Sequence, residues 1–413
     1  MRQTVTPGLD SEKTLVAFDL EVGGHHASYI QYLIEYWCEH ELSGRLVFVV
    51  APSFMRVHSA VVALREHYGR KDVAFVPVRD SAFAKLRSKF WVHRILKEWK
   101  LLGECSRELG ASHCLLMHYD RYQLAFTLSQ TPPSAVSGIY FRPILHYAQF
   151  ACHQFSLRDT IRVWRDKLLL RHNLRQVSLR YLFCLDPYAV EYIEALGGYG
   201  CPIYVPDPVK VHEDDASRGE ALRSGFRLGL HQKTFLLFGS LAWRKGLAQL
   251  LGALSLLPKT AAERMFLMLV GQLRMPNRDA FEAQIADVRA SLPIALFREH
   301  EFVPERDVQA YFGAADVILA PYQRHTGMSG VVVRAAAAGR PILAPTYGLI
   351  GELVRRHKLG LAVDTTRPAE IARALELFTC SAPDSVFDRR SALQFAQRHR
   401  PDQFAGAMLD RLW

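Results

Sequence analysis

The chain has 413 residues, of which 49% are hydrophobic and 22% are charged, and its formal net charge is +10 at pH 7. These values are typical of a globular protein and exclude disordered and collagen-like classes. No run of about 18 apolar residues occurs, so no membrane-spanning helix is expected. The length exceeds what one hydrophobic core usually serves, so two domains are expected.

The positive charge favours an anionic partner, such as a nucleotide phosphate, a membrane surface or a nucleic acid, although a generally basic proteome would give the same balance. The seven cysteines are scattered and form no C-x-x-C pair, so we expect neither a disulfide framework nor a zinc site. The N-terminal segment lacks the apolar stretch of a secretory signal. A reducing, cytoplasmic location is therefore expected.

Short apolar runs alternate with helical patterns through the first half of the chain. This alternation predicts an α/β fold with a parallel sheet, whose ligands bind at the carboxyl ends of the strands. The predicted strands are 14–20, 46–52, 73–78, 113–117, 138–141 and 181–187.

Two of these strand ends carry candidate functional residues. Gly23, Gly24 and His25 stand between a strand and a helix, where backbone N–H groups can approach an anion. His25 could equally be an exposed loop residue. His118 and Asp120 follow the fourth strand and are candidate catalytic residues. His118 could contact a sugar or a leaving group, or be a structural core histidine, and Asp120 or His25 could assist an acceptor hydroxyl.

Two basic segments contain apolar residues at helical spacing. Residues 79–102 interleave Lys and Arg with aromatic residues, a combination that can lie on an anionic membrane surface. An amphipathic helix of the domain, with a solvated basic face, is the alternative that we favour. Residues 155–180 could likewise form a lipid or nucleic-acid face, but Ile161, Trp164, Leu168 and Leu169 also fit plain helix packing.

The segment 197–211 is rich in Gly and Pro and is the predicted linker between domains. Beyond it the alternation of strands and helices resumes, and the chain is helical from about residue 368 onward. The clearest predicted strands of this half are 234–241, 265–272, 317–321, 341–345 and 359–363.

Two strand-to-helix turns in the second half suit a diphosphate. Arg244 and Lys245 precede a helix and combine two positive charges with its N-terminus, although solvated charges also occur at such positions. The second turn is a glycine-bearing loop that would offer backbone N–H groups to phosphate, unless its glycines only make a turn. Its residues are Thr326, Gly327, Met328, Ser329 and Gly330.

The two α/β halves, the R-K-G turn and the segment AADVILAPY…SG…AAAAGRPILAP…GELV…LGLAV resemble the GT-B glycosyltransferases. The resemblance is to the large retaining family of the family 4 type, including bacterial and cyanobacterial members, and it is strongest over residues 234–375. It implies two Rossmann-like domains that face each other across a cleft. These would be an acceptor domain at 1–205 and a nucleotide-sugar domain at 206–390, with a C-terminal helix at 391–413 packing back on the first domain.

The resemblance also implies hexosyltransferase chemistry, with a nucleotide-sugar as substrate and with neither a catalytic metal nor another cofactor. His118 would contact the donor sugar. The implied residues for the donor diphosphate and sugar are Gly23, Gly24, His25, Arg244, Lys245, Thr326, Gly327, Met328, Ser329, Gly330 and Arg334.

The chain departs from this family at an arginine that usually precedes the K-G turn, where Ser240 stands and Arg244 could substitute, and at a pair of glutamates. Thr326 and Arg334 align with two glutamates that usually contact the donor sugar and the ribose. Arg334 cannot accept hydrogen bonds from ribose hydroxyls, so it would pair with phosphate or turn away. Glu352 could replace a missing carboxylate, or it could cap its own helix.

The sequence therefore predicts a glycosyltransferase that acts on an unknown acceptor, either a small molecule, a lipid or a glycan. Peripheral contact with the inner membrane face is an accompanying expectation. The alternative is a catalytically lapsed GT-B protein that binds a nucleotide or a glycan as a partner subunit, which the missing glutamates favour. Nucleic-acid binding is not expected, because the chain contains no nucleic-acid recognition motif.

Overall fold

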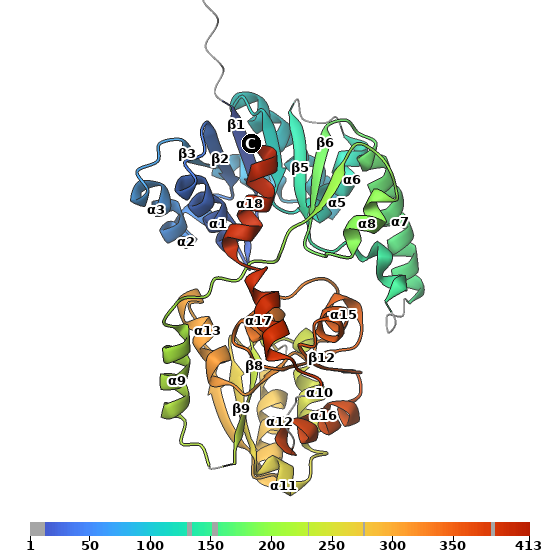
Figure 1. Cartoon of the computed structure of the whole chain (residues 1–413). Coiled ribbons are helices and arrows are strands. Elements are labelled where there is room, and N and C mark those ends of the chain that lie inside the picture. Colours follow the sequence, from blue (N-terminus) through green and yellow to red (C-terminus); the bar gives the residue numbers. More distant parts are fainter. Residues whose placement is uncertain (1–12, 130–133, 151–155, 230, 276, 381–384) are drawn as a thin grey trace, which may run out of the picture. The chain divides into compact units, whose positions relative to one another are not determined.

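The computed structural model describes residues 13–129, 134–150, 156–229, 231–275, 277–380 and 385–413 (Figure 1). The chain forms two compact units. The first contains Met1–Leu145, Ile161–Val205 and Asp402–Trp413, and the second contains His146–Thr160 and Pro206–Pro401. Each unit is built around one parallel sheet, which confirms the prediction of two α/β halves.

The sheet of the first unit has seven strands in the order β3-β2-β1-β4-β5-β6-β7. Its central strands are continuous apolar runs because helices cover both faces of a parallel sheet. The strands are β1 (Thr14–Asp19), β2 (Arg45–Val50), β3 (Val73–Pro77), β4 (His113–Leu116), β5 (Ala135–Tyr140), β6 (Leu179–Cys184) and β7 (Cys201–Tyr204). The associated helices are α1 (His26–Glu39), α2 (Phe54–Val57), α3 (Ser59–His67), α4 (Asp80–Leu86), α5 (Trp91–Glu108), α6 (Tyr119–Leu128), α7 (Leu157–Leu174), α8 (Ala189–Glu194) and α18 (Pro401–Leu412). The 3₁₀ turn η1 (Ile144–Gln149) begins in the first unit and continues into the second, and the first turn of α7 also belongs to the second unit.

The last helix, α18, is an integral part of the first unit and packs against α1. The Phe404 ring lies 4.5 Å from that of Tyr29, measured between centroids, and Phe404 is fully buried. The Tyr36 hydroxyl donates to Asp410 Oδ1 at 2.8 Å, on the same side of α1. These contacts fix the C-terminal segment by burial as well as by hydrogen bonding.

The sheet of the second unit has six strands in the order β10-β9-β8-β11-β12-β13. Figure 1 shows its helices on both sides of the sheet. The strands are β8 (Lys233–Phe238), β9 (Met265–Val270), β10 (Ala295–Glu299), β11 (Val317–Leu319), β12 (Ile342–Pro345) and β13 (Gly360–Val363). The helices are α9 (Asp215–Gly225), the 3₁₀ turn η2 (Trp243–Lys245), α10 (Leu247–Leu254), α11 (Lys259–Ala262), α12 (Arg278–Ser291), α13 (Glu305–Ala314), α14 (Gly330–Ala337), α15 (Gly348–Arg356), α16 (Pro368–Cys380) and α17 (Arg389–Gln397).

The boundaries differ from the predicted ones in three places. The expected linker 197–211 contains β7, a short edge strand that tolerates Pro202 because an edge strand needs fewer ladder hydrogen bonds. Residues His146–Thr160 belong to the second unit, not the first. The expected C-terminal helix 391–413 is two helices, of which α17 belongs to the second unit because it packs on α14.

Of the two basic segments, the first buries apolar side chains as expected, and the second exposes residues expected to pack. In the segment 79–102, Ile95 and Trp99 lie in the core of the first unit, in agreement with the domain-helix alternative. On α7, however, Ile161 and Trp164 are exposed, so plain helix packing is wrong for these residues. Among the helices that the structure describes, none is both long and apolar enough to cross a bilayer.

We predict that Phe404→Ala loosens the first unit alone. Loss of a fully buried phenyl group should lower the free energy of opening β1 and α1 by about 3 kcal/mol, because a cavity replaces its contacts. Amide hydrogen exchange measures this unit by unit, and Leu393→Ala, at a half-exposed position of α17, is the control. Equal loss of protection in β8 and β9 would contradict the assignment of α18 to the first unit.

Candidate functional site

The second unit gathers its candidate residues where β8 and the neighbouring β11 end. Both strands are parallel, so the loops that follow Phe238 and Leu319 leave the same edge of the sheet. Lys245 lies in the turn after β8, and Tyr322 lies in the loop after β11. Lys245 Nζ donates a hydrogen bond to the Tyr322 hydroxyl at 2.6 Å. Its Nζ also lies 4.2 Å from the centroid of the Tyr322 ring. This contact joins the two predicted diphosphate turns.

Gly246 gives the Lys245 turn its shape. Its φ of 72° lies in the left-handed region, which residues with a Cβ disfavour. A Cβ at this position would lie 1.8 Å from the Pro321 carbonyl oxygen. The close approach lets α10 begin directly beside the end of β11 and brings the side chain of Lys245 over Tyr322.

Lys245 is a buried cation, with only 8% of the residue exposed. Among the residues that the structure describes, no carboxylate forms an ion pair with it, and its hydrogen-bond partner is the neutral phenol of Tyr322. A buried charge is costly unless an opposite charge compensates it. The site is therefore electrostatically suited to an anion at the carboxyl end of β8.

Arg244 does not join Lys245 in a preformed clamp. The residue is exposed, and its backbone carbonyl accepts a hydrogen bond from the Gln323 N–H at 2.8 Å. The backbone of Arg244 thus ties η2 to the loop after β11, while its side chain lies at the surface.

The glycine-bearing loop lies directly before α14, as predicted, but one of its amides is already engaged. The Gly327 N–H donates to the Tyr147 hydroxyl at 3.1 Å, and Gly327 has a φ of 92°. The Met328 carbonyl accepts from His325 Nε2 at 3.2 Å. Thr326 is partly exposed in the same loop.

The N-terminus of α14 adds positive potential beside the loop. Ser329 is the N-cap residue, and its side chain makes no capping hydrogen bond. Its hydroxyl instead approaches the Tyr322 hydroxyl at 3.4 Å. A helix start leaves its first amides short of intrahelical acceptors, which is the usual basis for anion binding there. In α14 the Val332 N–H already donates to the Ser329 carbonyl at 3.0 Å.

Arg334 points along α14 to α13 and is held there. Its guanidinium pairs with the Glu305 carboxylate, and its NH1 lies 3.5 Å from Gln309 Oε1. Gln309 in turn donates to the Arg334 carbonyl at 3.1 Å. The carboxylate that the sequence lacks at position 334 is therefore present beside it, on another helix, and about half of the Glu305 side chain is exposed.

Glu352 is committed to its own helix. The residue is buried, and its carboxylate pairs with Arg355 and Arg356 in the next turn of α15. Of the two alternatives for Glu352, the structure favours a local structural role.

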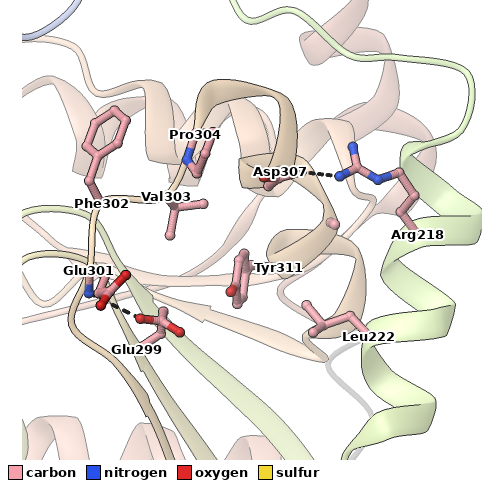
Figure 2. A pocket seen from close by; sticks show the side chains of 10 residues that line it. Arg218, Leu222, Glu299, Glu301, Phe302, Val303, Pro304, Asp307 and Tyr311 are labelled. Atoms are coloured by element: carbon pink, nitrogen blue, oxygen red, sulfur yellow. Dashed lines mark hydrogen bonds and ion pairs between the residues drawn. The ribbon is translucent and has the colours of Figure 1, made fainter.

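A pocket of about 340 Å³ lies where β10 ends and α13 begins (Figure 2). Figure 2 shows the Glu299 and Glu301 carboxylates on one side and the ion pair of Arg218 with Asp307 on the other. Tyr311 also lines the pocket, and burial, together with Glu299, raises the pKa of its hydroxyl. The pocket offers hydrogen-bond acceptors to an uncharged group and is unsuited to a phosphate.

The first unit has a separate cluster where β1, β4 and β5 end side by side. Asp19, the last residue of β1, contacts His26 at the start of α1, with 2.7 Å between Oδ2 and Nδ1. Both residues are buried. Gly23 and Gly24 lie exposed in the loop between them, and Gly24 has a φ of 72° that favours glycine.

His25 packs against three rings, those of His26, Tyr29 and Phe141, at centroid distances of 4.6, 4.7 and 4.7 Å. The residue is exposed, although these three rings lie against its imidazole. Desolvation, followed by the charge of His26, lowers the pKa of His25. At neutral pH, His25 is therefore an uncharged contact rather than a cation for phosphate.

His118 precedes the first residue of α6, and its side chain makes no capping hydrogen bond. It lies in the same cluster, with its ring 4.8 Å from that of Phe141 and 6.0 Å from that of His26. Burial, with a smaller effect of His26, lowers the pKa of His118 to about 4. In a neutral imidazole one ring nitrogen donates a hydrogen bond and the other accepts one. Such a group suits a sugar hydroxyl, which can both donate and accept.

Asp120 is engaged by the backbone. Its carboxylate accepts the N–H of Phe141 at 2.7 Å and that of Arg142 at 2.9 Å, so it orients the loop after β5. Burial raises the pKa of Asp120 to about 6, although these hydrogen bonds oppose the rise. His118 Nε2 lies 3.9 Å from Asp120 Oδ2, beyond hydrogen-bonding distance.

A buried carboxylate that the sequence did not single out supports this cluster. Glu98 is fully buried and accepts hydrogen bonds from Arg94, Arg121 and Tyr122. Arg121 also pairs with Glu21 in the loop after β1. The charge of Glu98 thereby holds the first glycine-bearing loop to α5 and α6.

Comparisons with known proteins agree with this architecture. Residues 232–379 match the family model of the group 1 glycosyl transferases. YtcC of Bacillus subtilis, a provisionally assigned glycosyltransferase, is 26% identical over 167 residues, which span 38% of this chain and 40% of YtcC. The matched stretch thus covers well under half of that relative.

Solved structures extend the likeness to nearly the whole chain. Anabaena HepE, determined in complex with UDP and glucose, has a TM-score of 0.64 at 15% identity and covers 97% of this chain and 99% of its own. WaaG, a glycosyltransferase involved in lipopolysaccharide biosynthesis, has a TM-score of 0.61 at 16% identity, with 95% and 99% covered. Sucrose-phosphate synthase from Thermosynechococcus elongatus has a TM-score of 0.62 at 14% identity, with 97% and 98% covered.

The chain has the fold of the GT-B glycosyltransferases. The family match lies in the second unit and nearly coincides with the stretch in which the sequence resemblance is strongest, so that resemblance is confirmed. Tyr322, Tyr147 and Glu305 contact the candidate residues of the second unit, and no sequence motif indicated them.

We predict that Gly246→Ala destabilises the second unit whereas Gly252→Ala does not. At Gly246 the added Cβ would need a left-handed backbone and would collide with the Pro321 carbonyl, at a cost of about 2 kcal/mol or more. At Gly252, inside α10, it would make ordinary contact with Pro368, and the helix should gain roughly 0.5–1 kcal/mol. Differential scanning calorimetry compares the two variants, and equal melting temperatures would contradict this account.

Proposed function

We propose that this chain is a glycosyltransferase that transfers a sugar from a nucleotide-sugar to an acceptor, with the diphosphate bound at the second unit. The observation that carries the proposal is Lys245, a buried ammonium group held by a neutral tyrosine at the carboxyl end of β8. A diphosphate would supply the opposite charge. The UDP complex of HepE, which has the same fold, supports this choice of ligand class.

The same residues suit the chemistry of glycosyl transfer. Negative charge builds on the leaving diphosphate as the sugar acquires oxocarbenium character, and stabilising that charge is the main electrostatic task. Lys245 and the amides at the start of α14 would supply this stabilisation, and Gly327 would exchange its bond to Tyr147 for one to the ligand. The exposed Arg244 side chain can approach the phosphates once they are bound.

Glu305 is proposed to take the place of the missing ribose carboxylate. Arg334 orients it, and its half-exposed oxygens can accept hydrogen bonds from ribose hydroxyls. The nucleobase, which is uncharged, would then extend from Pro304 into the pocket of Figure 2, where Glu299 and Glu301 accept from its N–H groups.

In the first unit, His118 and His25 are proposed to contact sugar hydroxyls as neutral imidazoles. Asp120 is proposed to act as a positioning residue, because both of its oxygens already hold the Phe141–Arg142 backbone. Gly23 and Gly24 leave open space above the loop, since a Cβ at either position would meet no atom within 4 Å. Retention of the anomeric configuration and transfer without a metal ion remain part of the proposal.

A catalytically lapsed GT-B protein is the second candidate. Thr326 has no carboxylate with which to contact the donor sugar, and this observation favours the lapsed protein. A lapsed protein would still bind a nucleotide at Lys245, so binding and turnover must be measured separately.

The experiment is a thermal-shift panel of UDP, GDP, ADP, dTDP and CMP, followed by turnover of the sugar derivatives of the best ligand. A ligand that binds only the folded state raises stability by about 2.7 kcal/mol at 100 times its dissociation constant. A selective shift with turnover supports the enzyme, and a shift without turnover supports the lapsed protein. No shift with any nucleotide would contradict both.

We further predict that Glu305→Gln reduces the preference for ribose over 2′-deoxyribose in that nucleotide. The loss of a charged acceptor should weaken binding of the ribonucleotide by about tenfold to a hundredfold and leave the deoxyribonucleotide nearly unchanged. Glu282→Gln, which removes another arginine-paired carboxylate in the same unit, is the control. An unchanged preference in Glu305→Gln would remove Glu305 from the site.

A further inference from the structure

Helix α7 carries a stripe of large apolar side chains that face solvent. Leu157, Ile161, Trp164 and Leu168 are 85, 69, 65 and 48% exposed. Their spacing of three and four residues places them on one face of the helix, along about 16 Å of its length. Scattered surface leucines are ordinary, but four aligned side chains that include a tryptophan indicate an interaction surface.

The opposite side of α7 packs against the first unit, so the helix already has a buried face besides the exposed stripe. Leu170, Asn173 and Leu174 are buried, and Asn173 Nδ2 donates to the Tyr119 hydroxyl at 2.9 Å. The anchored end fixes the rotation of the helix. The apolar stripe is therefore held outward by the packing of the same helix.

The charges of α7 are sorted around the stripe. Successive residues of a helix are about 100° apart, which places Arg158 and Arg165 roughly 70–90° to one side of the stripe. Lys167 and Arg171 lie roughly 50–90° to the other side by the same count. The two acidic residues, Asp159 and Asp166, fall about 170° away, on the far side of the helix.

Some of these cations have partners within the protein. Arg165 pairs with Asp166 at 2.6 Å, and Arg162 approaches the same carboxylate at 3.6 Å. Lys167 Nζ lies 5.4 Å from the centroid of the Tyr192 ring. These ion pairs and the cation–π contact lie at or beyond the edges of the stripe, and the acidic groups lie away from it. The outward face of α7 is therefore apolar at its centre and basic along both edges.

We infer that this face of α7 docks on an anionic lipid bilayer, with the helix lying along the membrane surface. An interfacial helix places its apolar side chains at the boundary between headgroups and acyl chains, and its flanking Lys and Arg reach the lipid phosphates. The distribution of charge on α7 matches this arrangement on both edges. The inference is independent of the nucleotide site, and it replaces segment 79–102 as the membrane-facing element.

The test is cosedimentation with sucrose-loaded vesicles of phosphatidylcholine alone and of an equimolar mixture of phosphatidylcholine and phosphatidylglycerol. The full chain should bind the mixed vesicles and not the neutral ones, and added salt should weaken binding. The triple variant Ile161→Ser, Trp164→Ser, Leu168→Ser should bind at least about tenfold more weakly, with an unchanged melting temperature. Leu256→Ser, at an exposed leucine of the second unit, is the matched control and should bind like the wild type.

Two further variants keep the test decisive. Arg158→Gln with Arg171→Gln changes no apolar group and should also weaken binding to the mixed vesicles, with a smaller salt dependence. Phe90→Ser with Trp91→Ser removes the exposed aromatic pair at the start of α5 and should leave binding unchanged.

Several results would overturn the inference. They are equal binding to neutral and mixed vesicles, no binding to either, wild-type binding by the triple variant, or loss of binding only in the Phe90 and Trp91 variant. The wild type could also self-associate in analytical ultracentrifugation without binding lipid. If the triple variant abolished that self-association, the stripe would be a contact with a second copy of the chain.

Discussion

The contact between Lys245 and Tyr322 is the interaction on which the second unit's site depends. It joins the turn after β8 to the loop after β11 and buries an ammonium group against a neutral phenol. Such a charge is stable only if a strong compensation is available, and a bound anion is the simplest one. Gly246 makes the contact possible by letting α10 begin against the backbone of Pro321, and Thr365 and Tyr347 fix Tyr322 by hydrogen bonds to its carbonyl.

The two units present different chemistry at their sheet edges. The second unit combines a buried cation, a helix N-terminus and, one helix away, the acidic pocket between β10 and α13. The first unit instead clusters uncharged imidazoles around Phe141, with the burial of His118 keeping it neutral at pH 7. A diphosphate suits the former environment and sugar hydroxyls suit the latter, so the proposed division of roles rests on local electrostatics rather than on the fold alone.

Much of the fold could be predicted because strands of parallel sheets are continuous apolar runs that end at turns, as at Val317–Leu319. The strand-end rule also led to Lys245 and His118. The sequence could not indicate Glu305 beside Arg334 or Tyr147 on Gly327, because these partners are 29 and 180 residues apart and meet only after packing. Likewise, periodicity located the stripe of α7 but not its direction, which depends on how Asn173 and Leu174 pack.

The most direct test of the central claim is the melting temperature of Lys245→Met, with and without the nucleotide that stabilises the wild type most. If Lys245 is a buried cation kept for an anion, the variant should melt at the same or a higher temperature without ligand, because the uncompensated charge is gone. Its affinity for the nucleoside diphosphate should fall by about tenfold to a hundredfold. A variant that melts lower yet shows the full ligand-induced shift would contradict the account and make Lys245 a structural residue.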